Sequence, residues 1–227
     1  MPTYKFPRPS VMVDIALVAF DAGVLKTLLI QRARPPFKGR WATPGGFIEM
    51  DETLLESAER ELKEETGLSG LRLEMFGVFG DPGRDPRGRS VAVGYWAAVR
   101  KDRVKPRARD DAGEVGWFNL IKPPPLAFDH DLILKTLHKN LRLKLHWFSN
   151  ALKFLPRTFT LNQARQLYDA VYRRKFRPAK FNRQIKEKYP LVPVPGAKPR
   201  TPAPARYSLS EKAAKRTEDN QSACVTL

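Results

Sequence analysis

The sequence predicts an α/β domain followed by a small domain of two helices and a hairpin, and three observations support this division. Between residues 1 and 148, apolar β-branched runs alternate with helical patterns, as is typical of α/β folds. Between residues 149 and 210, two short helical patterns precede two short apolar runs. The net charge also changes, from +5 in residues 1–150 (24 Lys and Arg, 19 Asp and Glu) to +12 in residues 151–227 (17 and 5).

Two strands open the first domain, at Val11–Phe20 and Val24–Gln31, and the short turn between them predicts a hairpin. The next strand, Trp41–Ile48, is short because Pro44, Gly45 and Gly46 interrupt it. Three further strands are predicted later in this domain, at Leu71–Gly80, Ser90–Val99 and Val115–Asn119.

An amphipathic helix is predicted between the third and fourth strands. Leu54, Ala58 and Leu62 recur at a spacing of four and form one apolar stripe. Asp51 is the predicted N-cap, and Gly67 is the predicted C-terminal stop. The helix therefore has an apolar side for the core and an acidic side for another purpose.

A second, basic amphipathic helix is predicted over Asp129–Trp147, where Asp129 and His130 are expected only to cap the helix. Residues 129–155 are also compatible with a helix lying on a membrane surface. A core-facing helix that continues into a linker explains the same pattern more simply, so we expect no membrane contact.

The second domain begins with Thr160-Leu-Asn-Gln163, which has the form of a capping box and precedes an apolar helical pattern. Another helix is predicted to open at Arg177-Pro178, because proline is tolerated in the first turn. Two apolar runs, Leu191–Val194 and Ala205–Leu209, then flank a proline-rich basic loop. This order is the outline of a small winged helix-turn-helix domain.

Composition excludes several classes of protein. No run of eighteen apolar residues is present, and the first ten residues have no apolar signal-peptide centre. The one cysteine, Cys224, excludes an intrachain disulfide and fits a reducing, cytoplasmic environment. The three histidines, His130, His138 and His146, are too scattered for a zinc site. Residues 211–227 are polar and are predicted to be a disordered tail.

The acidic side of the first helix predicts a metal site. Like charges at helical spacing repel, yet Glu61, Glu64 and Glu65 are expected to project from one side. Converging carboxylates suit Mg²⁺ or Mn²⁺, and magnesium commonly takes substrate phosphates as further ligands, so the pattern indicates a diphosphate. Gly45 and Gly46 allow the backbone to approach that ligand closely. The competing interpretation is a solvated acidic helix face.

The spacing of these residues decides between the two interpretations. The run resembles the Nudix box at every defining position: Gly46, Glu52, Arg60-Glu61-Leu62, Glu64-Glu65 and Gly67-Leu68. The resemblance implies a Nudix α/β/α sandwich with a mixed sheet and metal-dependent hydrolysis of a nucleoside diphosphate. It implies that Glu61, Glu64 and Glu65, with Gly45, belong to the metal site and help activate water. Arg60 and Glu52 would form a structural ion pair that orients the helix.

The flanking residues resemble one branch of that family, the ADP-ribose pyrophosphatases and the Nudix-related transcriptional regulators of NAD metabolism. Those regulators join a Nudix domain to a C-terminal winged helix. The resemblance covers about residues 8 to 209 and rests on Arg32, Pro35-Pro36-Phe37, Gly39, Trp41, Phe79–Arg89, Asp110-Asp111-Ala112, Trp117-Phe118, Leu126–His130 and residues 157–183.

ADP-ribose or a related nucleoside diphosphate sugar is the expected ligand. Guanidinium groups pair with phosphate oxyanions, and aromatic rings can stack on adenine or line its pocket. The expected substrate-binding residues are Arg32, Phe37, Trp41, Gly46, Arg84, Arg87 and Arg89. A solvated turn is the alternative for the arginines, and a core position is the alternative for Trp41. One further catalytic acid is sought among Asp110, Asp111 and Glu114.

Double-stranded DNA is the expected partner of the basic second domain. In a winged helix, the second helix of the motif reads base edges while other cations hold phosphates. The expected DNA-binding residues are Arg173, Arg174, Lys175, Arg177, Lys180, Asn182, Arg183, Lys186 and Arg200, with Lys198 and Arg206 also on the wing. The alternatives are a domain used only for dimerisation and a basic solubilising tail.

Three functions are therefore compatible with the sequence. The first is an ADP-ribose pyrophosphatase that yields AMP and ribose 5-phosphate. The second is an ADP-ribose-sensing transcriptional regulator, acting as a homodimer with weak or no hydrolysis. The third is an RNA-directed Nudix hydrolase, which the ADP-ribose-type flanks make the least favoured. Because all the box carboxylates are present, hydrolysis and DNA binding are expected to coexist.

Overall fold

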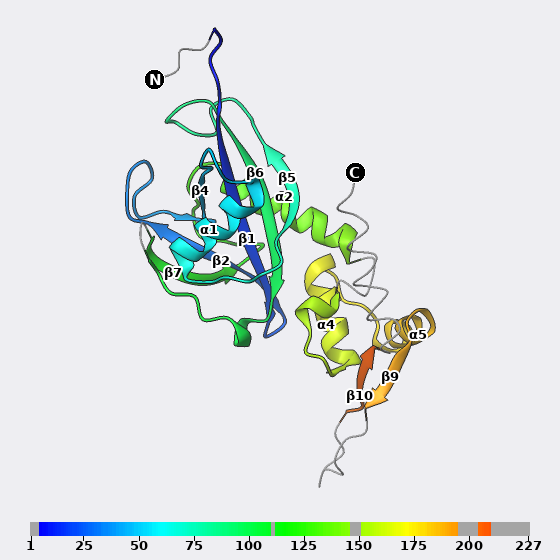
Figure 1. The fold of residues 1–227 in the computed structure, drawn as a ribbon. Helices are drawn as coiled ribbons and strands as arrows, with labels where there is room; N and C mark the ends of the chain where they lie inside the picture. Colours follow the sequence, from blue (N-terminus) through cyan, green and yellow to red (C-terminus); the bar gives the residue numbers. More distant parts are fainter. Residues whose placement is uncertain (1–4, 110–111, 146–150, 195–203, 210–227) are drawn as a thin grey trace. The chain divides into compact units, whose positions relative to one another are not determined.

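The computed structural model describes residues 5–109, 112–145, 151–194 and 204–209 (Figure 1). Several predictions lie outside these ranges: Asp110, Asp111, Lys198, Arg200, the 148/149 domain boundary and the tail at residues 211–227. Contacts within the chain group it into two compact units. The first comprises Met1–Asp21 and Leu25–Asn140, and the second comprises Ala22–Val24 and Leu141–Leu227.

The first unit is built on a seven-stranded sheet in which the central path runs β3-β2-β1-β6-β5. Strand β1 pairs in parallel with β6 and antiparallel with β4, so the sheet is mixed, as predicted. Strand β7 pairs with β2. The strands are β1 (Ser10–Asp21), β2 (Val24–Arg32), β3 (Trp41–Ala42), β4 (Gly45–Phe47), β5 (Glu74–Phe79), β6 (Ser90–Val99) and β7 (Ala112–Asn119).

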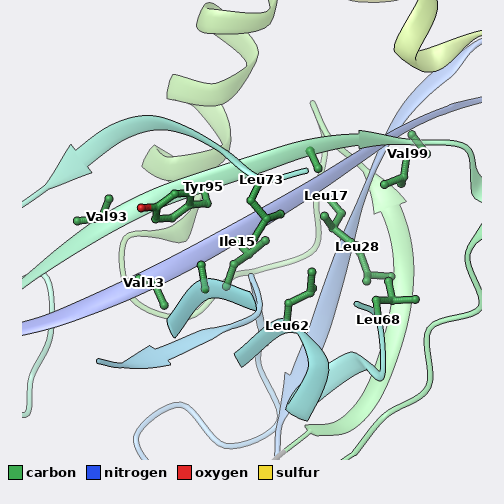
Figure 2. Packing of buried hydrophobic residues seen from close by; sticks show 13 residues of the cluster. Val13, Ile15, Leu17, Leu28, Leu62, Leu68, Leu73, Val93, Tyr95 and Val99 are labelled. Carbon is green, nitrogen blue, oxygen red and sulfur yellow. The ribbon is translucent and has the colours of Figure 1, made fainter. Parts of the chain in front are cut away.

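Helix α1 (Leu54–Thr66) packs on the sheet through the predicted apolar stripe. Because side chains alternate along a strand, Val13, Ile15 and Leu17 of β1 share one face and meet Ala58 and Leu62 of α1 (Figure 2). All five side chains are at most 1% exposed. This packing holds α1 against the middle of the sheet and leaves its acidic side outside the core.

Only the C-terminal end of α1 agrees with the prediction. Gly67 is the C-cap, with φ +71°, and its N–H donates to Lys63. The predicted N-cap, Asp51, is wrong, because Thr53 caps the helix instead. Thr53 and Glu56 form a capping box that satisfies two backbone N–H groups, which an aspartate two residues earlier would not reach.

Tertiary contacts also shift two strand ends. Strand β5 begins at Glu74 instead of Leu71, because its pairing with β6 starts at Glu74 opposite Trp96; Leu71 and Leu73 pack into the core ahead of the strand. Strand β7 begins at Ala112 instead of Val115, because Ala112 pairs with Arg32 beyond an irregularity in β2. Helix α2 (His130–Lys144) buries Ile133 and Leu134. A 3₁₀ turn, η1 (Lys101–Arg103), follows β6.

The second unit contains two helices and a small sheet. Helix α4 (Leu161–Tyr172) begins with the predicted Thr160–Gln163 capping box, and α5 (Pro178–Lys188) begins with Arg177 as N-cap and Pro178 in the first turn. The sheet order is β8-β10-β9. The remaining elements are η2 (Leu152–Phe154), β8 (Phe159–Thr160), β9 (Leu191–Val194) and β10 (Arg206–Leu209).

Aromatic packing joins α4 to α5 within this unit. The rings of Tyr168 and Phe181 lie 5.3 Å apart in an edge-to-face arrangement, and Phe176 contacts both. The Tyr168 hydroxyl donates to the Leu145 carbonyl, which satisfies a buried polar group. Among the described residues, no helix is both long and apolar enough to span a membrane.

Candidate functional site

An ion-pair cluster organises the acidic side of α1. Arg60 donates to Glu52 at 2.7 Å, to Glu61 at 2.8 Å and to Glu64 at 3.1 Å. It also donates to the Phe47 carbonyl at 3.0 Å, which ties α1 to β4. Hydrogen bonds from Arg60, and then from Ser57, lower the pKa of Glu52 to about 2. The expected Arg60–Glu52 pair is therefore present, and Arg60 also contacts two of the expected metal ligands.

Glu65 occupies a different environment from the other carboxylates of α1. It is buried, and its Oε2 accepts a hydrogen bond of 2.9 Å from the Gly45 N–H. Its pKa is raised to about 8, mainly by burial; the Gly45 hydrogen bond opposes this rise, and the charges of Glu61 and Asp14 contribute to it. Burial also raises the pKa of Glu61. For both carboxylates, the nearby hydrogen bonds and positive charges do not offset the cost of removing the charged group from water.

Two glycines make this close approach possible. A Cβ on Gly45, where φ is +155°, would lie 2.1 Å from the Val13 carbonyl oxygen. A Cβ on Gly46 would lie 2.2 Å from Glu61 Oε1. A side chain at Gly45 would therefore collide with the β1 backbone, and one at Gly46 would displace the Glu61 carboxylate.

The three expected metal ligands are not brought together as one ligand set. Among the described residues, no group of three or more His, Cys, Asp or Glu side chains is arranged to hold a metal ion. Glu61 and Glu64 accept from Arg60, while Glu65 faces Gly45. The donor chemistry nevertheless fits a divalent cation, because buried carboxylates with raised pKa values gain compensation from positive charge.

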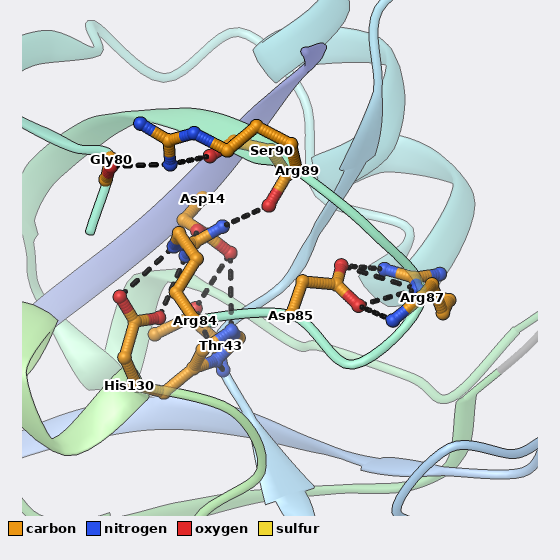
Figure 3. Close-up of polar contacts among 10 residues, drawn as sticks. Asp14, Thr43, Gly80, Arg84, Asp85, Arg87, Arg89, Ser90 and His130 are labelled. Carbon is orange, nitrogen blue, oxygen red and sulfur yellow. Dashed lines mark hydrogen bonds and ion pairs between the residues drawn. The ribbon is translucent and has the colours of Figure 1, made fainter. Parts of the chain in front are cut away.

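Arg84 lies in a buried network and not on an open surface (Figure 3). Its guanidinium donates to both oxygens of Asp129, at 2.9 and 2.7 Å, and to Asp14 at 3.3 Å. Its side chain is 4% exposed. The expectation that Arg84 contacts a phosphate is therefore revised, since the guanidinium is buried between two carboxylates and connects Asp129, just before α2, to Asp14 of β1.

His130 and Asp129 do more than cap α2. The Nδ1 atom of His130 accepts from the Thr43 N–H at 2.9 Å, and Nε2 lies 3.5 Å from Asp14. A backbone N–H can only donate, so Nδ1 is unprotonated and the ring proton lies on Nε2. Burial lowers the pKa of His130. The expectation of a cap alone was wrong, because both side chains form long-range contacts.

The other predicted ligand-binding residues differ in their surroundings. Arg87 pairs with Asp85 and lies over the rings of Phe47 and Phe128, at 4.9 and 5.3 Å. Arg89 is exposed and donates to the Gly80 carbonyl. The Trp41 ring packs against Phe118 of β7, with centroids 4.4 Å apart, so part of the ring is in contact with the sheet.

Arg32 and Phe37 lie around a residue that sequence reasoning did not select. The Arg32 guanidinium lies 4.8 Å from the centroid of the Phe128 ring, and Phe37 packs edge-on against the same ring at 5.0 Å. Phe128 belongs to the Leu126–His130 motif, and this motif was the feature of the sequence that could have pointed to it.

Glu114, one of the candidates for a further catalytic acid, lies on β7 opposite Gln31 and is exposed.

The predicted DNA-binding residues lie mostly on exposed surface of the second unit. Helix α5 buries Phe181 and Ile185, while Lys180, Arg183 and Lys186 are exposed. Arg173, Arg174, Lys175, Arg177 and Arg206 are also exposed, and Asn182 is half-buried.

Asp169, which the sequence analysis did not select, holds the turn between α4 and α5. Its buried carboxylate accepts from Arg165 and from the Phe176 N–H, both at 2.8 Å, and Lys175 lies 3.6 Å away. The indication available in the sequence was an acidic residue within a basic, apolar-patterned helix.

Comparison with known proteins supports this description. A NUDIX domain profile matches residues 11–137. The ADPR responsive transcriptional repressor NtrR of Acinetobacter baylyi is 33% identical over 186 residues, covering 80% of this chain and 74% of that protein. The ADP-ribose pyrophosphatase of Methanocaldococcus jannaschii is 46% identical over 128 residues, covering 56% of this chain and 72% of that protein.

A solved structure resembles both units. The crystal structure of Shewanella oneidensis NrtR complexed with a 27mer DNA matches with a TM-score of 0.69 at 27% identity. The match covers 90% of this chain and 95% of that chain. The likeness thus extends beyond the profile match and includes most of the second unit.

Proposed function

Since this chain belongs to the Nudix family, we propose that its first unit binds ADP-ribose, or a related nucleoside diphosphate sugar, and hydrolyses the diphosphate. The observation that carries this proposal is the complete box on α1, with Glu61 and Glu65 beside the Gly45-Gly46 backbone. The 46% identity to an ADP-ribose pyrophosphatase supports the choice of ligand.

Glu61, Glu64 and Glu65 would hold Mg²⁺ or Mn²⁺. When bound, the metal would neutralise the diphosphate and lower the pKa of the attacking water. Glu65 is oriented by the Gly45 N–H, and Arg60 orients α1 through Glu52 and the Phe47 carbonyl. These contacts limit the motion of the carboxylates, and such positioning contributes to catalysis.

The second unit, we propose, is a winged helix that binds double-stranded DNA. The order α4, α5 and then the β9–β10 pair has the expected outline, and α5 exposes Lys180, Arg183 and Lys186 on the side away from Phe181. Similarity over 80% of the chain to an ADPR responsive repressor supports this assignment. We propose that the chain acts on DNA as a homodimer.

The enzymatic part is tested by measuring AMP released from ADP-ribose with Mg²⁺. We expect Glu64→Gln to lower turnover by roughly 10²–10⁴-fold, a range typical of lost acid–base or charge function. Glu59→Gln is the matched control, because Glu59 lies on α1, is exposed and is not one of the defining positions of the box. Absence of AMP from the wild-type chain would refute hydrolysis.

The second candidate is a sensor of ADP-ribose with no turnover, and the similarity to the ADPR responsive repressor favours it. The test measures binding of the chain to promoter DNA of NAD-synthesis genes, with and without ADP-ribose. A change in DNA affinity together with absent AMP release would favour sensing. AMP release with no effect on DNA affinity would exclude it.

A further inference from the structure

Phe128 lies outside the residues of the Nudix box, yet two guanidinium groups lie over its ring. The distances to its centroid are 4.8 Å for Arg32 and 5.3 Å for Arg87. The Phe37 ring packs edge-on against it at 5.0 Å, with an interplanar angle of 72°. An aromatic face attracts cations through its quadrupole, so this ring influences where both guanidinium groups lie.

The backbone at Phe128 is held in an unfavourable conformation. Its φ is +51°, in the left-handed region that a bulky residue rarely adopts. Both neighbours are anchored: the Ala127 N–H donates to the Trp41 carbonyl at 2.8 Å, and Asp129 binds Arg84 through both carboxylate oxygens. Backbone strain of this kind persists where surrounding contacts impose it, and it concentrates at ligand sites.

Arg87 links the Phe128 ring to the strand beside α1. Its guanidinium also lies 4.9 Å from the centroid of Phe47, whose carbonyl accepts from Arg60. Its Nε and Nη2 pair with Asp85, which fixes the guanidinium in place, while the Arg87 side chain stays 37% exposed. Arg32, at the end of β2, lies over the same ring, so Phe128 holds two cations close to each other.

We propose that Phe128 is a positioning residue that places Arg32 and Arg87 to receive the diphosphate of the ligand. The inference rests on the proposed function and adds to it a preference for a diphosphate over a single phosphate. Two cations held on one ring match two adjacent phosphate groups better than one, because guanidinium groups pair with separate oxyanions. The ring forms no hydrogen bond, so its effect on the ligand passes through the two arginines.

The test compares Phe128→Leu with Phe128→Tyr, which keeps the aromatic face. Loss of two cation–ring contacts predicts a roughly fivefold to thirtyfold rise in KM and Kd for ADP-ribose in the leucine variant. The value of kcat should stay within about twofold, and the rise in Kd for AMP should be smaller. The tyrosine variant should stay close to wild type. Phe76→Leu is the control, since Phe76 packs against Phe79.

A double-mutant cycle with Arg87→Gln separates positioning from a general structural effect. If Phe128 acts through Arg87, the two substitutions together should raise Kd by less than the product of their separate effects. Where Phe128→Leu fails to fold, Phe128→Met replaces it in the cycle.

Three outcomes would overturn the inference alone: an unchanged Kd in Phe128→Leu, an equal loss in Phe128→Tyr, or full multiplicativity in the cycle. A wild-type chain that neither binds nor cleaves ADP-ribose would overturn the proposed function, and this inference with it.

Discussion

At the scale of single residues, environment decides what each carboxylate of the Nudix box does. Glu52 is held by Arg60 and keeps a very low pKa, whereas burial raises the pKa of Glu65 to about 8. The two side chains have the same chemistry and lie thirteen positions apart on neighbouring structure. The difference arises because Glu65 points toward the sheet and accepts only a backbone N–H in the described contacts.

Gly46 allows the first test at this scale. We predict that Gly46→Ala lowers ADP-ribose hydrolysis by about 100-fold, because the new Cβ would displace Glu61 and misplacement of about 1 Å has effects of that size. Gly113→Ala is the control, since its nearest contact would be 3.6 Å away. Activity within twofold of wild type in Gly46→Ala would show that Glu61 tolerates the displacement.

His130 allows a second test, of stability against pH. Its folded-state pKa lies below the ordinary 6.5, so stability is present above pH 6.5 and is lost as pH falls. We predict that His130→Gln removes up to about 1.4 kcal/mol of this loss per pH unit below 6.5. The measurement is urea unfolding of both proteins between pH 5 and 7.5, in which parallel pH dependences would contradict the assignment.

At the scale of elements, buried polar contacts fix the ends and turns that sequence patterns leave open. The α4–α5 turn depends on Asp169, whose carboxylate gathers Arg165, Lys175 and the Phe176 N–H. In the first unit, Arg84 similarly connects Asp129, just before α2, to Asp14 of β1. In both cases, a buried charge is tolerated because oppositely charged groups surround it.

The turn is tested with Asp169→Asn, which keeps the shape and removes the charge. We predict a loss of roughly 2–3 kcal/mol of stability, typical of hydrogen bonds to a charged group. Asp131→Asn should cost less than about 0.5 kcal/mol, because the Asp131–Lys135 pair is exposed. Urea denaturation followed by circular dichroism measures both, and equal losses would exclude a special role for Asp169.

At the scale of the whole molecule, positive and negative side chains concentrate in different parts of the chain. The chain carries a net charge of +17, of which +12 belongs to residues 151–227 (17 Lys and Arg against 5 Asp and Glu). The carboxylates, by contrast, concentrate on α1 in the first unit. This separation fits one unit that handles a small anion and another that meets a polyanion.

The charge distribution predicts how DNA binding depends on salt. Each lost phosphate contact lowers the slope of log K against log salt by about 1, so replacing Lys180, Arg183 and Lys186 by alanine should lower it by up to about 3. Replacing the exposed Arg103, Lys105 and Arg107 removes the same charge from the first unit and should leave the slope unchanged. Fluorescence anisotropy with duplex DNA distinguishes these results, and equal slopes in all three proteins would contradict the assignment to α5.

Much of the fold could be predicted because it follows from local patterns. The apolar stripe of α1, the Thr160 capping box and strand β6 depend on neighbouring residues, and the structure confirms them. The role of Thr53 as N-cap was missed because Asp51 is an equally good capping residue when judged locally. Similarly, Arg84 looked like a phosphate ligand because its partners, Asp14 and Asp129, are distant in sequence.

The sequence by itself determined that this is a Nudix chain with an intact box and a basic second segment, because spacing along a helix and net charge are local properties. Only the tertiary structure decided that Arg60 holds Glu61 and Glu64, that Glu65 is buried against Gly45, and that Phe128 lies beneath two guanidinium groups. These facts depend on desolvation and on contacts between distant segments, which arise only when the sheet and its helices are assembled.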